Sequence, residues 1–455
     1  MTTHVFAGPT VTADRVRELL PGAVLHPPVC HGDLLRLGAV AGDTVVLIDG
    51  LWHQSAPVRH KEILVLLADR VTVVGTASMG ALRAAELAPY GMIGIGSIFE
   101  DFRTGILDAD DEVAVLHTPD GQVLSEALVN IRAAVRQTAH AGRISAEDAT
   151  ALEGLARALP YTRRTWAALG RAAAGAGAGA AFERVNVWRH ANSYDVKRED
   201  AEAALATVAG GLPRPATSMW TGEPWQTSFV RYWQAAFGTA GTVPFLAVLQ
   251  HQQLYDSGFP ARWRARVLAA IAGRRSGSTD DMEATALRLA AAEGVDPIAM
   301  TRRQVEFWLA SQEIRDLERG ERLVRMMVRS ARLDGAWSLW PSTLEQAGDL
   351  LDPGIGTVEA VAAAYALNAA VEQADPRHST DRLSAGRIGD HLAQRWALPP
   401  DAARPILDAA ARDRAFRDFA GAVEVARAFY LGARDTSTTS SAIVGGTGVR
   451  DSQRT

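Results

Sequence analysis

The chain has 455 residues, a formal net charge of −5 and an isoelectric point of about 6.1, so it lacks the bulk positive charge typical of nucleic-acid partners. Its hydrophobic content of 47% is enough for packed cores, and its length predicts two or three domains. Its single cysteine, Cys30, excludes an internal disulfide and a multi-cysteine metal site. Because it shows neither a signal-peptide start nor an apolar run of about 20 residues, we expect a soluble cytoplasmic protein with no membrane partner.

The first 135 residues alternate short apolar strands with helices. We predict strands at 5–7, 23–25, 45–48, 71–74 and 113–116, and helices at 12–20, 31–37, 57–69, 79–87, 99–107 and 124–138. Such alternation is typical of a parallel sheet covered on both faces. Residues 91–96 are glycine-rich but lack the lysine and the spacing of a phosphate loop, so we interpret them as a turn or a short strand.

From about residue 145 onward the pattern is nearly all helical. The predicted fold class is therefore an α/β N-terminal domain with a mostly parallel sheet, followed by a mainly α-helical C-terminal half. We expect an α/β core at 1–145, a helical extension of that core at 146–212, a helical C-terminal domain at 213–433 and a disordered tail at 434–455. Residues 210–215, rich in glycine and proline, are the best linker candidate.

Lysine is rare in this chain. Of the 47 basic residues only Lys61 and Lys197 are lysines. Arginine stays protonated at any useful pH, whereas a desolvated lysine can lose its proton and act as a base. Lys61 lies near the edge of the apolar side of the predicted 57–69 helix, 17 residues before Ser78. The alternatives are that Lys61 is a solvated surface lysine and that both lysines are remnants of an arginine-biased composition.

Ser78 follows a predicted buried strand, in the segment Gly75-Thr-Ala-Ser-Met-Gly80. A strand, a tight turn and a helix are the setting of a nucleophile elbow, although the first glycine of Gly-x-Ser-x-Gly is missing here. The start of the next helix would present the backbone N–H groups of Met79 and Gly80, which could hold an oxyanion. The alternative is that Ser78 only caps this helix, as serines commonly do.

Three charged residues could support a site at Ser78. Asp49 follows the predicted central strand, which is a typical position for a polar site residue in an open α/β sheet. Arg83 and Glu86 lie three residues apart on the helix after Ser78. They form either a simple ion pair or a pair that holds the site and binds an anionic group.

Two other kinds of site are disfavoured. His53, His60 and Asp49 could be a metal cluster, but no metal-ligand spacing supports it, and we expect no metal. Cys30 beside His31 could be a reactive thiol or carry a persulfide, but an incidental cysteine is favoured.

A run of arginines marks the second half of the chain. Its members recur at steps of three and four residues: Arg315, Arg319, Arg322, Arg325, Arg329 and Arg332. We interpret them as a basic stripe on one helix, which is usually a solvated face with local ion pairs. The alternative is a docking site for an acidic partner protein.

Eight ordered segments of the N-terminal third resemble the TfuA family. They are Val5-Phe-Ala-Gly-Pro-Thr10, Ile48-Asp-Gly50, His60-Lys-Glu-Ile-Leu64, Gly75-Thr-Ala-Ser-Met-Gly-Ala-Leu-Arg-Ala-Ala-Glu-Leu87, Pro89-Tyr-Gly-Met92, Gly94-Ile-Gly96, Asp111-Glu-Val-Ala114 and Leu124-Ser-Glu-Ala-Leu-Val-Asn-Ile-Arg132. The resemblance spans about residues 3–135, with a weaker match at 197–200. It does not extend to the helical second half.

The resemblance implies a role in peptide-backbone thioamidation during ribosomal peptide natural-product biosynthesis. The partner would be a YcaO-type enzyme, which uses ATP to activate a backbone amide oxygen of a precursor peptide before sulfide replaces it. TfuA proteins are thought to release that sulfide by hydrolysing the C-terminal thiocarboxylate of a ThiS-like sulfur carrier protein with a Ser–Lys pair, and to help YcaO bind its peptide. Carried onto this sequence, the pair is Ser78 and Lys61.

The same resemblance implies no cofactor on this chain, because ATP belongs to the partner. A narrow channel would admit the flexible tail of the carrier, and Gly91, Gly94 and Gly96 could let backbones approach that tail closely. Two other hypotheses remain. The chain could be a non-catalytic adaptor that recruits or activates YcaO and its peptide, or Cys30 could relay sulfur as a persulfide.

Overall fold

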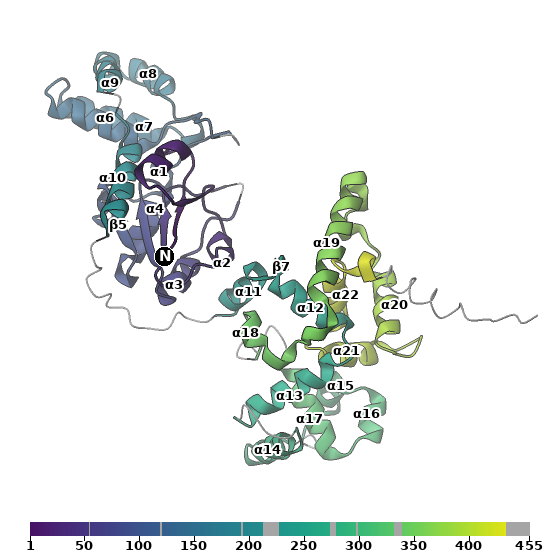
Figure 1. The fold of residues 1–455 in the computed structure, drawn as a ribbon. Coiled ribbons are helices and arrows are strands. Elements are labelled where there is room, and N and C mark those ends of the chain that lie inside the picture. Colours follow the sequence, from purple (N-terminus) through teal and green to yellow (C-terminus); the bar gives the residue numbers. More distant parts are fainter. Residues whose placement is uncertain are drawn as a thin grey trace, which may run out of the picture. The chain divides into compact units, whose positions relative to one another are not determined.

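The chain folds into two compact units, Met1–Gln226 and Thr227–Thr455 (Figure 1). The computed structural model describes residues 1–53, 55–118, 121–192, 194–212, 227–273, 279–296, 299–331 and 339–433. The predicted tail at 434–455 and half of the candidate linker at 210–215 lie outside these residues.

The first unit contains a five-stranded sheet in which every strand is parallel to its neighbours, as predicted. The strands are β1 (Thr3–Phe6), β2 (Val24–His26), β3 (Thr44–Leu47), β4 (Thr72–Thr76) and β5 (Ile93–Ile95), and their spatial order is β2-β1-β3-β4-β5. The strand order therefore reverses between β1 and β3. In open α/β sheets, ligands bind outside the carboxyl ends of the strands near such a reversal.

Helices cover both faces of this sheet. They are α1 (Ala13–Leu19), α2 (Asp33–Arg36), α3 (His60–Ala68), α4 (Met79–Leu87), α5 (Ser97–Arg103) and α10 (Val196–Gly210). Side chains alternate along β3: Val45 and Leu47 pack with α3 and α4, whereas Val46 packs with α1 and α10. Strands buried on both faces explain the continuous apolar runs in the sequence.

The region predicted as a helical extension contributes to two different layers. Helices α7 (Ala146–Ala158), α8 (Trp166–Gly175) and α9 (Gly179–Asn192) share a separate apolar core with α6 (Leu128–His140). Helix α10 instead returns to the sheet, where Ala201 and Leu205 pack against the face that contains Val46.

Four predicted elements need correction. The helix predicted at 99–107 begins at Ser97 and ends at Arg103. The predicted strand at 113–116 is irregular, and its backbone bonds to side chains: the Leu116 N–H donates to Ser125 Oγ (2.7 Å), and the Val113 carbonyl accepts from Lys197 Nζ (2.9 Å). Helix α3 begins at His60 and α6 at Leu128, three or four residues later than predicted, because the residues before them have extended backbones.

The second unit is mainly helical, as predicted. Its core surrounds Trp263, Phe245 and Phe259. No helix in the described part of the chain has the length and apolar character needed to cross a bilayer. The elements are α11 (Ser228–Phe237), β6 (Thr239–Ala240), β7 (Val243–Pro244), α12 (Phe245–Tyr255), α13 (Phe259–Ile271), α14 (Thr279–Ala292), α15 (Arg302–Trp308), α16 (Ser311–Asp316), α17 (Arg319–Ser330), α18 (Leu344–Ala347), α19 (Thr357–Ala374), α20 (Ala385–Arg395), α21 (Arg404–Asp413) and α22 (Phe419–Ala426).

The arginine run does not lie on one helix, because it is divided between α16 and α17. It is also not a uniformly solvated face. Arg329 is 1% exposed and pairs with Glu313 and Asp413, each at 2.7 Å. Arg325 pairs with Glu313 and Glu321. These two arginines hold the second unit together, and Arg332 lies outside the described residues.

The first turn of α4 lies very close to β3. The Gly80 N–H donates to the Ile48 carbonyl (3.2 Å), and a Cβ at Gly80 would lie 1.8 Å from the Leu47 carbonyl oxygen. A Cβ at Gly75 would lie 2.1 Å from the Gly80 carbonyl oxygen. Only glycine permits this approach at both positions.

We predict that Gly80→Ala destabilises the first unit by about 1–3 kcal/mol or more, because the added methyl group meets rigid backbone. The control is Gly154→Ala in α7, where a Cβ meets nothing within 4 Å and alanine should stabilise the helix by about 0.5–1 kcal/mol. Denaturant unfolding would measure both effects. An unchanged midpoint for Gly80→Ala would contradict this account of the contact.

Candidate functional site

A strained turn joins β4 to α4. The Ser78 N–H donates to the Thr76 carbonyl (2.7 Å), which closes a three-residue turn around Ala77. Ala77 has φ +63° and is fully buried. A left-handed φ is uncommon for a residue with a Cβ, and γ-turns with a positive central φ are strained. Strain of this kind is concentrated at functional sites, so the turn makes Ser78 a candidate.

The Ser78 hydroxyl is available for chemistry. Ser78 occupies the N-cap position of α4, but its hydroxyl makes no capping hydrogen bond. The hydroxyl also has no other hydrogen-bond partner among the residues described. The observed geometry therefore differs from the simple capping alternative. Of the two predicted oxyanion donors, Gly80 already donates to Ile48, which leaves the Met79 N–H at the positive end of the helix dipole.

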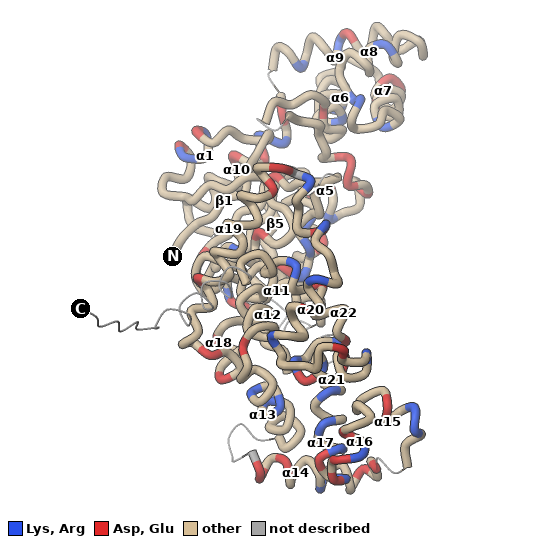
Figure 2. Tube along the Cα trace, turned by 90° about the vertical axis from the view of Figure 1, so that its right-hand side faces the viewer, with Lys and Arg blue, Asp and Glu red and all other residues tan. Residues whose placement is uncertain are grey.

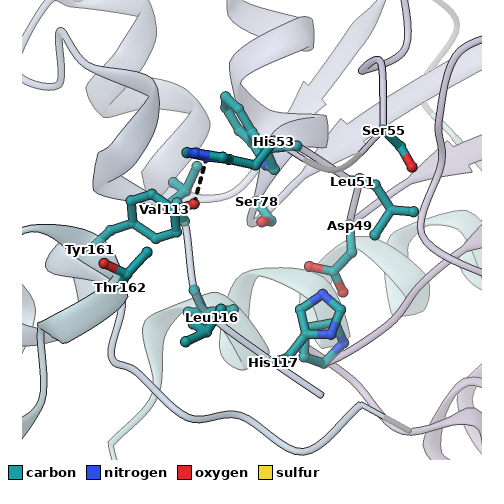
Figure 3. Close-up of a pocket in the computed structure, with 15 residues that line it drawn as sticks. Asp49, Leu51, His53, Ser55, Ser78, Val113, Leu116, His117, Tyr161 and Thr162 are labelled. Atoms are coloured by element: carbon teal, nitrogen blue, oxygen red, sulfur yellow. Dashed lines mark hydrogen bonds between the residues drawn. The ribbon is translucent and has the colours of Figure 1, made fainter. Parts of the chain in front are cut away.

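Ser78 lines a cavity of about 260 Å³ beyond the carboxyl ends of the strands. In Figure 3 the Ser78 hydroxyl and the Asp49 carboxylate point toward the space between them. The cavity is smaller than typical pockets for drug-sized ligands, so it favours a slender group. Its lining consists of Pro9, Ser55, Ser78 and residues 49–53, 113–117 and 161–162.

Asp49 holds the loop that follows β1. Its carboxylate is 3% exposed and accepts from the Gly8 N–H (2.9 Å), the Thr10 N–H (3.1 Å) and the Thr10 hydroxyl (2.6 Å). These three bonds fix the segment that carries Pro9 to the cavity wall. Asp49 therefore shapes the site in addition to supplying a negative charge.

The cavity rim contains residues that the sequence did not assign to this site. Tyr161 Oη lies 2.8 Å from His53 Nδ1, which connects two segments about 100 residues apart (Figure 3). His117 lies on another part of the lining. No local sequence pattern brings these residues together. Across the described residues, no group of three or more potential ligands forms a metal site.

The predicted supporting pair Arg83–Glu86 lies outside the cavity lining. Arg83 Nη1 lies 2.6 Å from Glu86 Oε2, and His60 Nε2 lies 2.7 Å from the same oxygen. Burial alone would raise the pKa of Glu86, but the hydrogen bonds from His60 and Arg83 outweigh it and lower that pKa. This cluster joins α3 to α4. Lys61 is half-buried in the first turn of α3, and it too is not part of the cavity lining.

The predicted channel glycines also lie outside the cavity lining. A Cβ at Gly94 would lie 2.1 Å from the Phe99 ring, and one at Gly96 would lie 2.4 Å from the Asp200 carboxyl carbon. Gly91 ends a short turn with φ +101°. These glycines permit close packing of α5 and α10 against the sheet.

The other lysine lies beside the cavity. Lys197, in the first turn of α10, is 4% exposed and, like Lys61, is not part of the cavity lining, but its Nζ donates to the carbonyl of the lining residue Val113. The sequence could single out Lys197 by its rarity. Its position depends on the return of α10 to the sheet, which no local pattern specifies.

Cys30 has the environment of an unreactive thiol. Its Sγ lies 3.1 Å from Asp33 Oδ2, and it does not line the cavity. Burial and then the hydrogen bond to Asp33 raise the pKa of Cys30 from 9.0 to about 11. Because the thiolate is the nucleophile, this environment disfavours a persulfide relay.

We predict slow alkylation of Cys30 in the folded protein at neutral pH. A pKa rise from 9.0 to about 11 reduces the thiolate fraction about 100-fold. Iodoacetamide labelling followed by mass spectrometry would measure the rate, with denatured protein as the control. Equal rates in the two states would contradict the prediction.

Comparison with known proteins identifies the domain that contains this cavity. Residues 49–165 match the family model described as TfuA-like protein, which confirms the resemblance found in the sequence. The matched segment contains every cavity-lining residue except Pro9, and it ends before α10. No protein of curated function matches the chain. A TfuA-like domain suggests a role in the TfuA/YcaO thioamidation system.

Proposed function

We propose that this chain, whose first unit carries a TfuA-like domain, supplies sulfide for backbone thioamidation by hydrolysing a protein thiocarboxylate at Ser78. The observation that carries the proposal is the position of the Ser78 hydroxyl. This hydroxyl makes no capping hydrogen bond, and a strained turn before α4 places it at a small cavity. The partners are a YcaO-type enzyme with its precursor peptide and a ThiS-like carrier protein, as the family resemblance implies.

The cavity suits the end of a flexible chain. A volume of about 260 Å³ has room for a terminal thiocarboxylate and a short stretch of small residues. His53 and Tyr161, which both line the cavity, are joined by a 2.8 Å contact. A ubiquitin-like carrier that ends in glycine would insert its tail while its folded body stays outside.

The chemistry is a nucleophilic acyl substitution. Ser78 Oγ bonds to the thiocarboxylate carbon as a lysine amine takes the hydroxyl proton, and the carbonyl oxygen becomes an oxyanion. As the C–S bond breaks, the lysine returns the proton to sulfur, and an acyl-serine ester remains. Water then hydrolyses the ester with the same base. In total, RCOS⁻ and H₂O give RCOO⁻ and H₂S, with no oxidation or reduction.

The start of α4 favours the oxyanion. The Met79 N–H has no acceptor within the described part of the chain, and the helix adds the positive end of its dipole. A donor that is fixed before the reaction needs no reorganisation when charge develops. The close contact of Gly80 with β3 supplies that rigidity.

We predict that Ser78→Ala lowers sulfide release from a thiocarboxylated carrier by at least about 1,000-fold, because it removes the nucleophile. The matched control is Ser145→Ala at the start of α7, since the Ser145 hydroxyl does cap its helix by accepting from the Asp148 N–H (3.0 Å). That variant should lose about 1 kcal/mol of stability and keep its activity.

The two serine variants separate catalysis from folding. Sulfide release and thermal unfolding would be measured on both. Undiminished release by a folded Ser78→Ala protein would eliminate the hydrolase proposal.

One observation favours a docking role for the second unit. A hollow of about 620 Å³ is lined by four arginines and only one acidic residue, Glu306; the arginines are Arg302, Arg315, Arg319 and Arg322. In Figure 2 basic positions recur along α15, α16 and α17, with acidic positions between them. The hollow would accept an acidic segment of the YcaO-type partner. Docking there and hydrolysis at Ser78 are compatible.

We predict that the double variant Arg315→Glu/Arg319→Glu weakens binding to the YcaO partner about tenfold or more, because like charges would meet at the interface. Sulfide release should not change. Arg377→Glu/Arg404→Glu, which makes the same charge change at other exposed positions of this unit, is the control. Calorimetric titration would measure binding. Equal affinities for both double variants would rule out the hollow as the docking site.

A further inference from the structure

The amine of Lys197 is buried with only part of its hydrogen-bonding capacity used. The ammonium group has three N–H donors, and in the described structure Nζ donates to one acceptor, the Val113 carbonyl at 2.9 Å. No described carboxylate lies within salt-bridge distance of it. A buried charge without such a partner destabilises the folded state, so a lysine with a purely structural role here would lower the protein's stability.

The Lys197 amine bonds to a residue that lines the cavity. Val113 lines the same cavity as Ser78, and so does Asp49, which is the acidic group with the strongest electrostatic effect on Lys197. The irregular segment 113–116, predicted as a strand, lines the cavity and contacts α10 through the bond between Val113 and Lys197. A strand there would engage the Val113 carbonyl in a ladder, whereas the irregular backbone leaves it for Lys197.

The first two turns of α10 fix the positions of both the Lys197 amine and the turn that carries Ser78. Asn130 anchors Lys197: its Oδ1 accepts from the Lys197 N–H (3.3 Å), and its Nδ2 donates to Asp195 Oδ1 (3.1 Å). One turn further along α10, the Asp200 carbonyl accepts from the Thr76 hydroxyl (3.1 Å). Thr76 immediately precedes Ala77 and Ser78, so a single helical segment fixes the positions of both Lys197 and the Ser78 turn.

The protonation of Lys197 suits a base. Burial lowers the pKa of Lys197 from its ordinary value of 10.5, and the charges of Asp49, Asp195 and Glu126 oppose this shift without cancelling it. A lowered pKa increases the neutral fraction near neutral pH, and only neutral lysine accepts a proton. Arginine could not replace it in this role.

We propose that Lys197, rather than Lys61, is the base that takes the Ser78 proton, which it returns to the leaving sulfur. This assignment rests on the proposed hydrolysis at Ser78. The proton moves from Ser78 Oγ to Lys197 Nζ as the O–C bond forms, and from Nζ to sulfur as the C–S bond breaks. Asp49 then stabilises the transient ammonium.

The first test is selective acetylation of the full-length protein, which is possible because the chain has only two lysines. Acetylation with an N-hydroxysuccinimide ester should modify Lys61 and leave the buried Lys197 intact, as peptide mass spectrometry would show. Sulfide release from a thiocarboxylated carrier should then be retained. Loss of release when Lys61 is the only acetylated lysine would overturn the assignment.

The second test is mutational. Lys197→Met should lower kcat for sulfide release at least about 100-fold, the low end of general-base effects, whereas Lys61→Met should change it less than about threefold. The pH profile separates a base from a structural lysine: kcat/KM of the wild type should fall as acid protonates Lys197, and the residual activity of Lys197→Met should lack that dependence.

The outcomes distinguish the assignment from the function on which it rests. If Ser78→Ala abolishes release but a folded Lys197→Met protein keeps wild-type kcat, Lys197 is not the base and the hydrolase proposal stands. If Ser78→Ala has no effect, the hydrolase proposal itself fails. If Lys197→Met does not fold, the acetylation test still decides between the two lysines.

Discussion

The contact between the first turn of α4 and strand β3 positions the candidate nucleophile. Two glycines, Gly75 and Gly80, let the backbones meet, and the Gly80 N–H bonds to the Ile48 carbonyl. This contact fixes where α4 begins, so the residue before the helix must turn sharply out of β4. Ala77 adopts its left-handed conformation at that point, and Ser78 faces the cavity as a result. The cost of the strained turn is offset by packing, since Ala77 and Met79 are both fully buried.

A second constraint acts from far along the chain. Helix α10 covers the sheet face beside α1, and its Asp200 carboxylate accepts from the Ser97 and Ile98 N–H groups at the start of α5. The Asp200 backbone carbonyl meanwhile accepts from Thr76. One residue of α10 therefore ties the end of β4 to the start of α5. The family match at residues 49–165 does not reach this part of α10, which contains both Lys197 and Asp200.

The sequence predicted what depends on local patterns. Apolar runs identified β3 and β4, and the turn residues at 75–80 located Ser78. A buried strand, a turn and a helix in succession depend on residues that are close in sequence, so a local pattern is enough to predict them. It did not predict what depends on distant packing. The segment 113–116 is apolar like a strand, yet its Val113 carbonyl bonds to Lys197 and its Leu116 backbone bonds to residues 124–125. The rarity of lysine and the family resemblance pointed to Lys61 as the partner of Ser78, whereas the bond between Lys197 and the lining residue Val113 depends on the distant return of α10. The His53–Tyr161 contact at the rim likewise joins segments that no periodicity relates.

The different use of arginine and lysine in buried positions follows from their chemistry. Arg164 and Arg329 are almost completely buried, and each pairs with carboxylates: Arg164 with Asp111, and Arg329 with Glu313 and Asp413. A guanidinium keeps its charge, and at these two positions carboxylates compensate it. Among the described residues, the one acceptor bonded to Lys197 Nζ is the Val113 carbonyl. An amine at that position can become neutral, and the cavity residue Asp49 is near enough to favour its charged form when a proton arrives. The proposed exchange of a proton with Ser78 therefore suits a lysine at this position and could not be performed by an arginine.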